Sequence, residues 1–260
     1  MNNFTFIFIN SIIYCVNFSI TMPFNIDAFI CTKEDQYTHT SYNGRKGLFK
    51  IDNLDDLDRF NDFILTNRLA KRYTFVEMKT PYYKLIIDLD FKDDDRFKAV
   101  SRFDVNKLTD SIMSAFIETL GYFVEDSELY DKYIYSDKSE GNGVHIYFPE
   151  LIVNNNFARA VRSHVIECLL RDKKYKEIDQ ETWKNIIDGS LYYGTGMKLM
   201  FQTVKKAYYK VNPEKSTLKG LSTERKHLLE LTRIRTPSTS YNFTPKTNKK
   251  GKALYTFYLD

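Results

Sequence analysis

The chain has 260 residues, 43% hydrophobic and 28% charged, with 38 basic and 34 acidic side chains that give a net charge of +4. This length and apolar content can form one large domain or two small ones, so we expect a soluble globular protein. The three cysteines form no Cys-x-x-Cys pair, which excludes a zinc knuckle or an iron–sulfur cluster and favours a reducing, intracellular compartment.

The charge is unevenly distributed along the chain. Residues 198–260 hold 14 Lys and Arg against 4 Asp and Glu, which leaves the rest of the chain net acidic. An acidic half beside a basic half suits an enzyme that binds metal ions in one place and a nucleic-acid backbone in another. Lys205, Lys206 and Lys210 are the expected backbone contacts. The alternative is a basic, solvated tail, and we expect residues 236–260 to be partly disordered.

The first 24 residues are strongly apolar, but Asn10, Asn17 and other polar residues interrupt them. They lack the basic start and the cleavage site of a signal peptide, and their apolar pieces are shorter than the ~20 residues of a membrane span. We therefore expect residues 1–22 to be an upstream extension or a flexible N-terminus, with Met22 as the working start. The alternative is an ordinary buried strand or helix.

Apolar periodicity predicts helices and strands in mixed order over the rest of the chain. The expected helices are residues 53–71, residues 105–120, and a stretch that begins after Asn155 or Asn156 and carries His164 as a packing residue. Asp104 is expected to cap the second helix and Gly121 to end it. The expected strands are residues 84–91, 132–136, 143–148 and 196–204.

The strand of residues 84–91 ends in two aspartates separated by one residue. Because side chains alternate across a strand, Asp88 and Asp90 leave the same face. Two carboxylates so close repel each other unless a cation lies between them, so the pair indicates a divalent metal ion. The adjoining run Asp93-Asp94-Asp95 is expected to be a solvated loop.

Two later segments extend this pattern. His145 lies in the strand of residues 143–148 after a glycine-containing loop, and Asp188 follows the apolar pair Ile186-Ile187. A strand-like run that contains Lys198 comes next. Each residue has a simpler alternative, since His145 can be a satisfied core histidine and Asp188 can be a turn or helix-end residue.

The order of acidic pair, histidine, single aspartate and lysine resembles the archaeo-eukaryotic primase superfamily, most of all the primase domain of the primase-helicases of large DNA viruses. The resemblance covers roughly residues 73–206. It implies that Asp88, Asp90 and Asp188 are catalytic carboxylates that bind two Mg²⁺ or Mn²⁺ ions. It also implies that His145 contacts the triphosphate of the incoming nucleotide.

Two positions depart from the family's usual pattern. Lys198 stands where arginine is usual, which keeps the charge but loses the two-pronged grip on a phosphate. Gly143 stands where the small residue is often serine. The resemblance places both at the nucleotide, and the neighbouring glycines would let the backbone approach the triphosphate closely: Gly141, Gly194 and Gly196.

The resemblance also implies a fold and an activity. The fold is α+β, with a palm like an RNA-recognition fold beside an N-terminal α/β unit, over residues 23–235. The activity is template-directed nucleotidyl transfer that makes or extends primers on single-stranded DNA from nucleoside triphosphates, away from membranes and at replication sites in the cytoplasm or nucleus of a host if the chain is viral. A replicative helicase is expected in cis or in trans, because no Gly-x-x-x-x-Gly-Lys-Ser/Thr loop occurs here.

Three other functions fit part of this pattern. A metal-dependent nuclease would use the same carboxylates without a histidine and a lysine for a triphosphate. A glycosyltransferase also uses Asp-x-Asp with manganese, but it has no evident use for Asp188. A catalytically inactive single-stranded DNA-binding subunit would use the basic half and some of the 19 tyrosines and 20 phenylalanines as stacking platforms.

Overall fold

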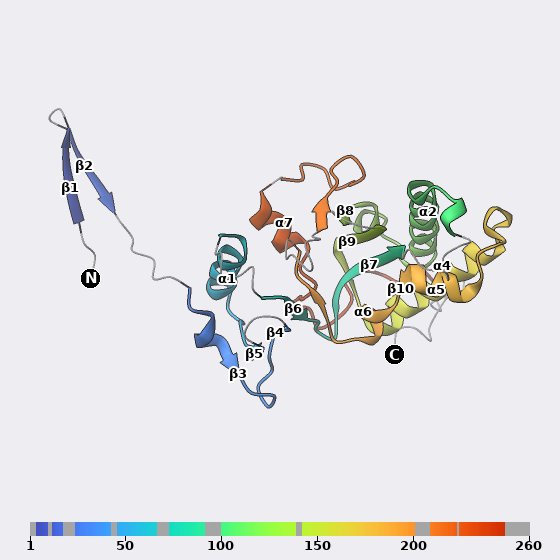
Figure 1. Cartoon of the computed structure of the whole chain (residues 1–260), viewed down its shortest axis with the longest axis horizontal. Helices are drawn as coiled ribbons and strands as arrows, with labels where there is room; N and C mark the ends of the chain where they lie inside the picture. Colours follow the sequence, from blue (N-terminus) through green and yellow to red (C-terminus); the bar gives the residue numbers. More distant parts are fainter. Residues whose placement is uncertain are drawn as a thin grey trace.

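The computed structural model describes residues 4–9, 12–17, 24–42, 46–66, 73–91, 100–138, 142–200, 209–222 and 224–247. Two five-stranded antiparallel sheets with helices around them make up most of these residues, so the predicted α+β class is confirmed (Figure 1). Strands β1 (Phe4–Ile9) and β2 (Ile12–Asn17) form a separate antiparallel hairpin. The predicted upstream extension over residues 1–22 stays a prediction.

The first sheet has the strand order β11-β6-β4-β5-β3. Its strands are β3 (Ile30–Cys31), β4 (His39–Ser41), β5 (Gly47–Phe49), β6 (Phe75–Met78) and β11 (Gly196–Lys198). Helix α1 (Leu54–Thr66) packs on this sheet through Phe60, whose ring meets that of Phe75 edge-on at 5.0 Å. Lys226 in α7 (Arg225–Leu231) forms ion pairs with α1.

The second sheet has the strand order β10-β7-β9-β8-β12. Its strands are β7 (Tyr83–Phe91), β8 (Ile134–Lys138), β9 (Asn142–Val153), β10 (Ile187–Asp188) and β12 (Tyr209–Val211). Its helices are α2 (Val105–Phe123), α3 (Glu128–Asp131), α4 (Asn155–Arg171) and α5 (Gln180–Ile186). Helix α6 (Ser190–Tyr193) follows β10.

The second sheet is built from a β-α-β-β-α-β unit made of β7, α2, β8, β9, α4 and β10. Along β7, Leu85, Ile87 and Leu89 are fully buried and alternate with the residues that carry the two carboxylates. Helices α2 and α4 pack together on one side of this sheet (Figure 1). The central strands β7 and β9 therefore have one face in the apolar core and one face for polar side chains.

Several predicted boundaries differ from the observed ones. Asp104 caps α2 as predicted, by accepting hydrogen bonds from the amides of Asn106 and Lys107. Gly121 does not end this helix, which runs to Phe123, because a glycine ends a helix most often when its φ is positive and among the described residues only Gly220 has such a φ. Asn154 caps α4 in place of the two asparagines that follow it.

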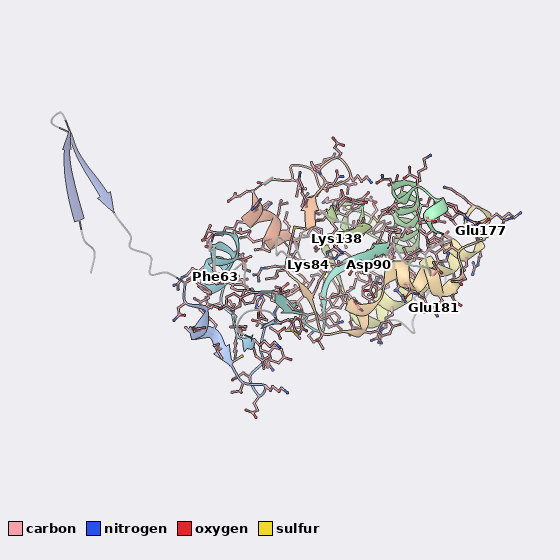
Figure 2. The ribbon with its side chains drawn as sticks, in the orientation of Figure 1. Phe63, Lys84, Asp90, Lys138, Glu177 and Glu181 are labelled. Atoms are coloured by element: carbon pink, nitrogen blue, oxygen red, sulfur yellow. The ribbon has the colours of Figure 1, made fainter. Side chains whose placement is uncertain are left out.

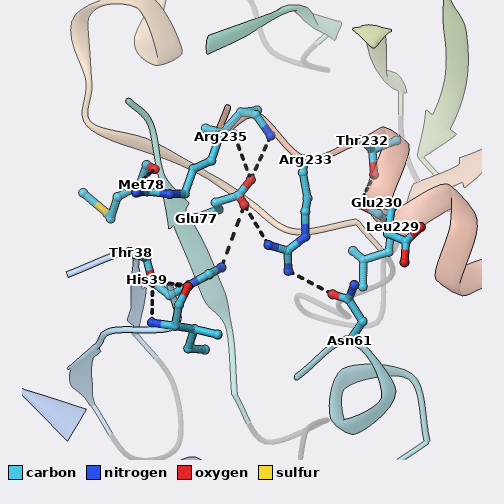
Figure 3. A network of polar contacts seen from close by, with 12 residues as sticks. Thr38, His39, Asn61, Glu77, Met78, Leu229, Glu230, Thr232, Arg233 and Arg235 are labelled. Carbon is cyan, nitrogen blue, oxygen red and sulfur yellow. Dashed lines mark hydrogen bonds and ion pairs between the residues drawn. The ribbon is translucent and has the colours of Figure 1, made fainter. Parts of the chain in front are cut away.

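A buried ion pair joins the first sheet to the segment after α7 (Figure 3). Glu77 on β6 lies 3.2 Å from the Arg233 guanidinium, and the two side chains are 1% and 8% exposed. Glu77 also accepts a hydrogen bond from the Ile234 amide at 2.8 Å, while the Ile234 carbonyl accepts one from the Lys84 amide on β7. The segment after α7 therefore ties β6 to β7.

The chain beyond this segment continues along the second sheet's helices. Asn242 accepts a hydrogen bond from the Ile152 amide, and the Phe243 ring lies 4.9 Å from that of Phe157. The predicted strand of residues 196–204 is observed as β11, which ends at Lys198; residues 199–200 are not in a strand, and residues 201–204 lie outside the described residues. No helix in the described ranges is long and apolar enough to cross a membrane.

Candidate active site

Three of the predicted site residues lie in one row across the second sheet. Asp188 on β10 is the register partner of Asp88 on β7, which is the partner of His145 on β9. Residues directly opposite each other in an antiparallel sheet project from the same face. The sheet therefore brings Asp188, Asp88 and His145 together, with Ser136 of β8 next in the row.

A second row runs beside the first. Asp90 is paired with Gly143, and Lys138 follows the residue that is paired with Val144, so Lys138 extends the row on the same face. Figure 2 shows Asp90 and Lys138 in the central region of the molecule. The sequence did not indicate Lys138, because the glycine-containing segment before Gly143 is typical of a loop. Strand alternation from Ser136 would place Lys138 on the face of Asp88 and Asp90.

His145 is held between a carboxylate and a tyrosine. Its Nε2 lies 3.2 Å from Asp88 Oδ1, and its Nδ1 shares a hydrogen bond of 3.0 Å with the Tyr147 hydroxyl. The histidine is 6% exposed. Both ring nitrogens therefore have partners, as in a satisfied core histidine. The partner of Nε2 is Asp88, the predicted metal ligand.

Asp188 also has a local structural role. One carboxylate oxygen accepts a hydrogen bond from the Ser190 amide at 2.8 Å, and the other accepts one from the Ser190 hydroxyl at 3.0 Å. These bonds shape the turn from β10 into α6, as the simpler alternative expects. Each oxygen can accept a further bond, so the turn does not prevent ligand binding.

The carboxylates suit a divalent metal ion by their chemistry. Asp88 Oδ1 is buried and lies 3.2 Å from His145 Nε2 without forming a hydrogen bond, so it is a hard oxygen donor that an ion could bind. Asp90 leaves the same face two residues further along β7. Among the described residues, no group of three or more His, Cys, Asp or Glu side chains is arranged to hold a metal.

The remaining predicted residues are not gathered in these rows. Lys198 lies on β11 in the first sheet, opposite Val76, and its side chain lies outside the described part. Lys210 is paired with Asp137, so it alternates with the row of Asp88 and belongs to the other face of the sheet. Lys205, Lys206 and Gly141 lie outside the described residues.

Two of the predicted nucleotide glycines have a packing role. A Cβ atom at Gly196 would lie 2.3 Å from the Glu77 carbonyl oxygen, and one at Gly194 would lie 2.6 Å from that of Ser190. Both distances are shorter than any real Cβ contact. At both positions the glycine therefore lets the backbone approach another backbone segment of the same chain, whereas the sequence indicated a close approach to the triphosphate.

Helix α6 is anchored to β7 by Tyr192. The Tyr192 hydroxyl donates a hydrogen bond of 2.6 Å to the Ile86 carbonyl on β7. Burial, followed by the neighbouring Tyr83 and the charges of Asp88 and Asp188, raises the pKa of Tyr192. The tyrosine therefore remains a hydrogen-bond donor at neutral pH, and α6 stays fixed to the strand that carries the acidic pair.

A family comparison agrees with this arrangement. The second sheet carries carboxylates on β7 and β10 and a histidine on β9. The profile of the C962R protein N-terminal AEP domain, where AEP denotes archaeo-eukaryotic primase, matches residues 38–215. The chain therefore belongs to the archaeo-eukaryotic primase domains of viral C962R-like proteins. No curated protein matches the chain.

Proposed function

We propose that the chain is a template-directed, metal-dependent nucleotidyltransferase that makes or extends primers on single-stranded DNA. The observation that carries this proposal is the row of Asp188, Asp88 and His145 on three adjacent strands. Membership of a primase and polymerase family that generally uses divalent metals supports it. We further propose that β7 to β10 with α2 and α4 act as the catalytic palm within residues 23–235.

Each residue of the row has a distinct role in this proposal. Asp88, Asp90 and Asp188 would hold two Mg²⁺ or Mn²⁺ ions, which when bound activate the attacking 3′-hydroxyl and stabilise the pyrophosphate leaving group. Tyr147 engages Nδ1 of His145, and Nε2 lies 3.2 Å from Asp88 Oδ1. We assign Nε2 to the triphosphate, which it would contact once a metal ion occupies that carboxylate oxygen. Lys198 is the proposed second positive charge on the triphosphate.

The substrates and partners follow from this chemistry. Gly143 carries no side chain between Asp90 and Lys138, which leaves room on this face for phosphate groups. We propose nucleoside triphosphates and a single-stranded DNA template as substrates, with Lys205, Lys206 and Lys210 along the template backbone. A replicative helicase would act with the chain, in cis or in trans, at the site of replication.

The test is nucleotide incorporation on a primer–template with Mg²⁺ or Mn²⁺. We expect Asp88→Asn to reduce incorporation to below about a tenth of wild type, because the amide would no longer hold the metal ion that stabilises the transition state. Asp110→Asn, an exposed change on α2, is the matched control and should leave incorporation unchanged. Incorporation by Asp88→Asn above a tenth of wild type would overturn the metal-binding role.

The same assay separates the alternatives. A nuclease would shorten the labelled strand in the presence of metal and would incorporate no nucleotide. An inactive binding subunit would retain the DNA without changing its length. Either result with the wild-type chain would overturn the proposed activity.

A further inference from the structure

Helix α6 crosses from one sheet to the other. The chain leaves the second sheet at Asp188 and enters the first sheet at Gly196, and α6 occupies the crossing (Figure 1). Lys79, just after β6 of the first sheet, donates a hydrogen bond of 2.5 Å to the Leu191 carbonyl. Since Tyr192 binds β7, α6 is attached to both sheets directly beside the candidate active site.

Three positive side chains surround this short helix. Arg159 donates two hydrogen bonds to the Tyr192 carbonyl, and Arg162 donates to the carbonyls of Ile187 and Lys184. Lys79 is the third cation. Within the described ranges none of the three forms an ion pair, and carbonyl oxygens orient a cation without neutralising its charge. The junction therefore holds three positive charges that can attract phosphate.

An exposed aromatic ring lies beside Arg159. Tyr193 is 64% exposed, and the Arg159 guanidinium carbon lies 4.3 Å from its ring centroid. A Cβ atom at Gly189 would lie 3.0 Å from the Tyr193 ring, so the absence of a side chain there lets the ring sit beside the residue that follows Asp188. The arginine fixes the ring, and most of the ring surface stays open to solvent.

We propose that Tyr193 and Arg159 form a stacking platform for one base of a single-stranded nucleic acid beside Asp188 of the candidate active site. An open aromatic face beside oriented cations is the combination that binds single strands without sequence preference. Lys79 and Arg159 lie where the phosphates next to the stacked base would pass. The inference rests on the proposed function and adds a contact that the basic residues 198–260 do not provide.

The first test measures binding of a fluorescent oligo-dT to the full chain, in EDTA and without nucleotide, by fluorescence anisotropy. Tyr193→Ala should weaken the affinity about fivefold or more, because base–aromatic stacking contributes on the order of 1–3 kcal/mol per base. Tyr193→Phe keeps the ring and should bind within about twofold of wild type. The control is Tyr42→Ala, which removes a ring that is 60% exposed and directly follows β4 of the first sheet.

The second test uses the dependence of affinity on salt. Arg159→Gln should reduce the slope of log affinity against log salt by about 0.7, the value for one phosphate contact on a single strand. A set of oligo-dT probes should each carry one 2-aminopurine at a different position. At one position the 2-aminopurine should fluoresce more strongly when bound to Tyr193→Ala than when bound to wild type, because stacking on the ring quenches it. Thermal melts confirm that each variant is folded.

These results separate the platform from the catalytic proposal. If Tyr193→Ala binds oligo-dT like Tyr42→Ala and Arg159→Gln leaves the slope unaltered, the platform is wrong, whatever Asp88→Asn does to incorporation. If Tyr193→Ala loses affinity while the wild-type chain incorporates no nucleotide, the platform stands and the polymerase activity fails. The position of the affected 2-aminopurine on the template or the primer strand of a partial duplex identifies which strand is stacked.

Discussion

Asp188 lies directly opposite Asp88 in the β10–β7 ladder, so carboxylates from two distant segments of the chain share one face of the sheet. Like charges in directly opposed positions destabilise a sheet when no cation lies between them. Asp88 Oδ1 is also buried without a hydrogen bond, and its contact at 3.2 Å with His145 Nε2 offsets this cost only when the histidine is protonated. The two carboxylates are therefore arranged at the expense of stability, as is common at functional sites.

This cost predicts a stabilising substitution. Asp88→Asn should raise the melting temperature in EDTA by about 1–3 °C, because relief of a cross-strand repulsion is worth a few tenths of a kcal/mol to 1 kcal/mol. Added Mn²⁺ should stabilise the wild type and have little effect on the variant. Equal stabilisation of both proteins by Mn²⁺ would show that the ion binds elsewhere.

A second prediction concerns His145. His145→Ala should raise the Michaelis constant for the nucleotide about tenfold or more and leave affinity for single-stranded DNA within about twofold, because the side chain is assigned to the triphosphate. Tyr147→Phe removes the hydroxyl that holds Nδ1 and should cause a smaller loss in the same direction. Equal losses of nucleotide and DNA binding after His145→Ala would assign the histidine to a structural role.

A third prediction concerns the buried pair of Glu77 and Arg233. Arg233→Met should lower the free energy of unfolding by about 3–5 kcal/mol, because it leaves the Glu77 carboxylate buried without its partner. Adding Glu77→Gln to this variant should restore part of the loss, since no buried charge then remains. Urea titrations of the two single variants and the double variant measure the coupling. Additive losses in this cycle would mean that the pair is not coupled.

Local sequence patterns were enough to predict the strand of Asp88 and Asp90 and the helix that Asp104 caps. Their apolar spacing and capping chemistry depend only on neighbouring residues. Asp188, Asp88 and His145 were singled out by a family resemblance, but their alignment in one row depends on strand pairing between distant segments.

Other features could not be predicted because they depend on tertiary contacts. Glu77 and Arg233 are 156 residues apart, and neither has a pattern that indicates a buried partner. His39 received no role from the sequence, yet it is fully buried with its Nε2 3.9 Å from Glu77. Lys198 stays a predicted nucleotide contact, and its place on β11 of the other sheet, beyond the crossing at α6, could not be read from local sequence.

The last prediction concerns pH and Lys79. Burial, together with the charge of Arg159, lowers the pKa of Lys79 from 10.5 to about 8. Between these two values the unfolded chain binds more protons at this position than the folded chain, so the contribution of Lys79 to stability rises with pH from about 8 to 10.5. The melting temperature of the wild type, measured relative to that of Lys79→Met, should therefore increase from pH 7 to pH 9.5. Lys107→Met, an exposed change on α2, should follow the wild type at both pH values. A constant difference between wild type and Lys79→Met would mean that the lysine keeps its usual pKa, and the positive charge beside α6 would then persist throughout this range.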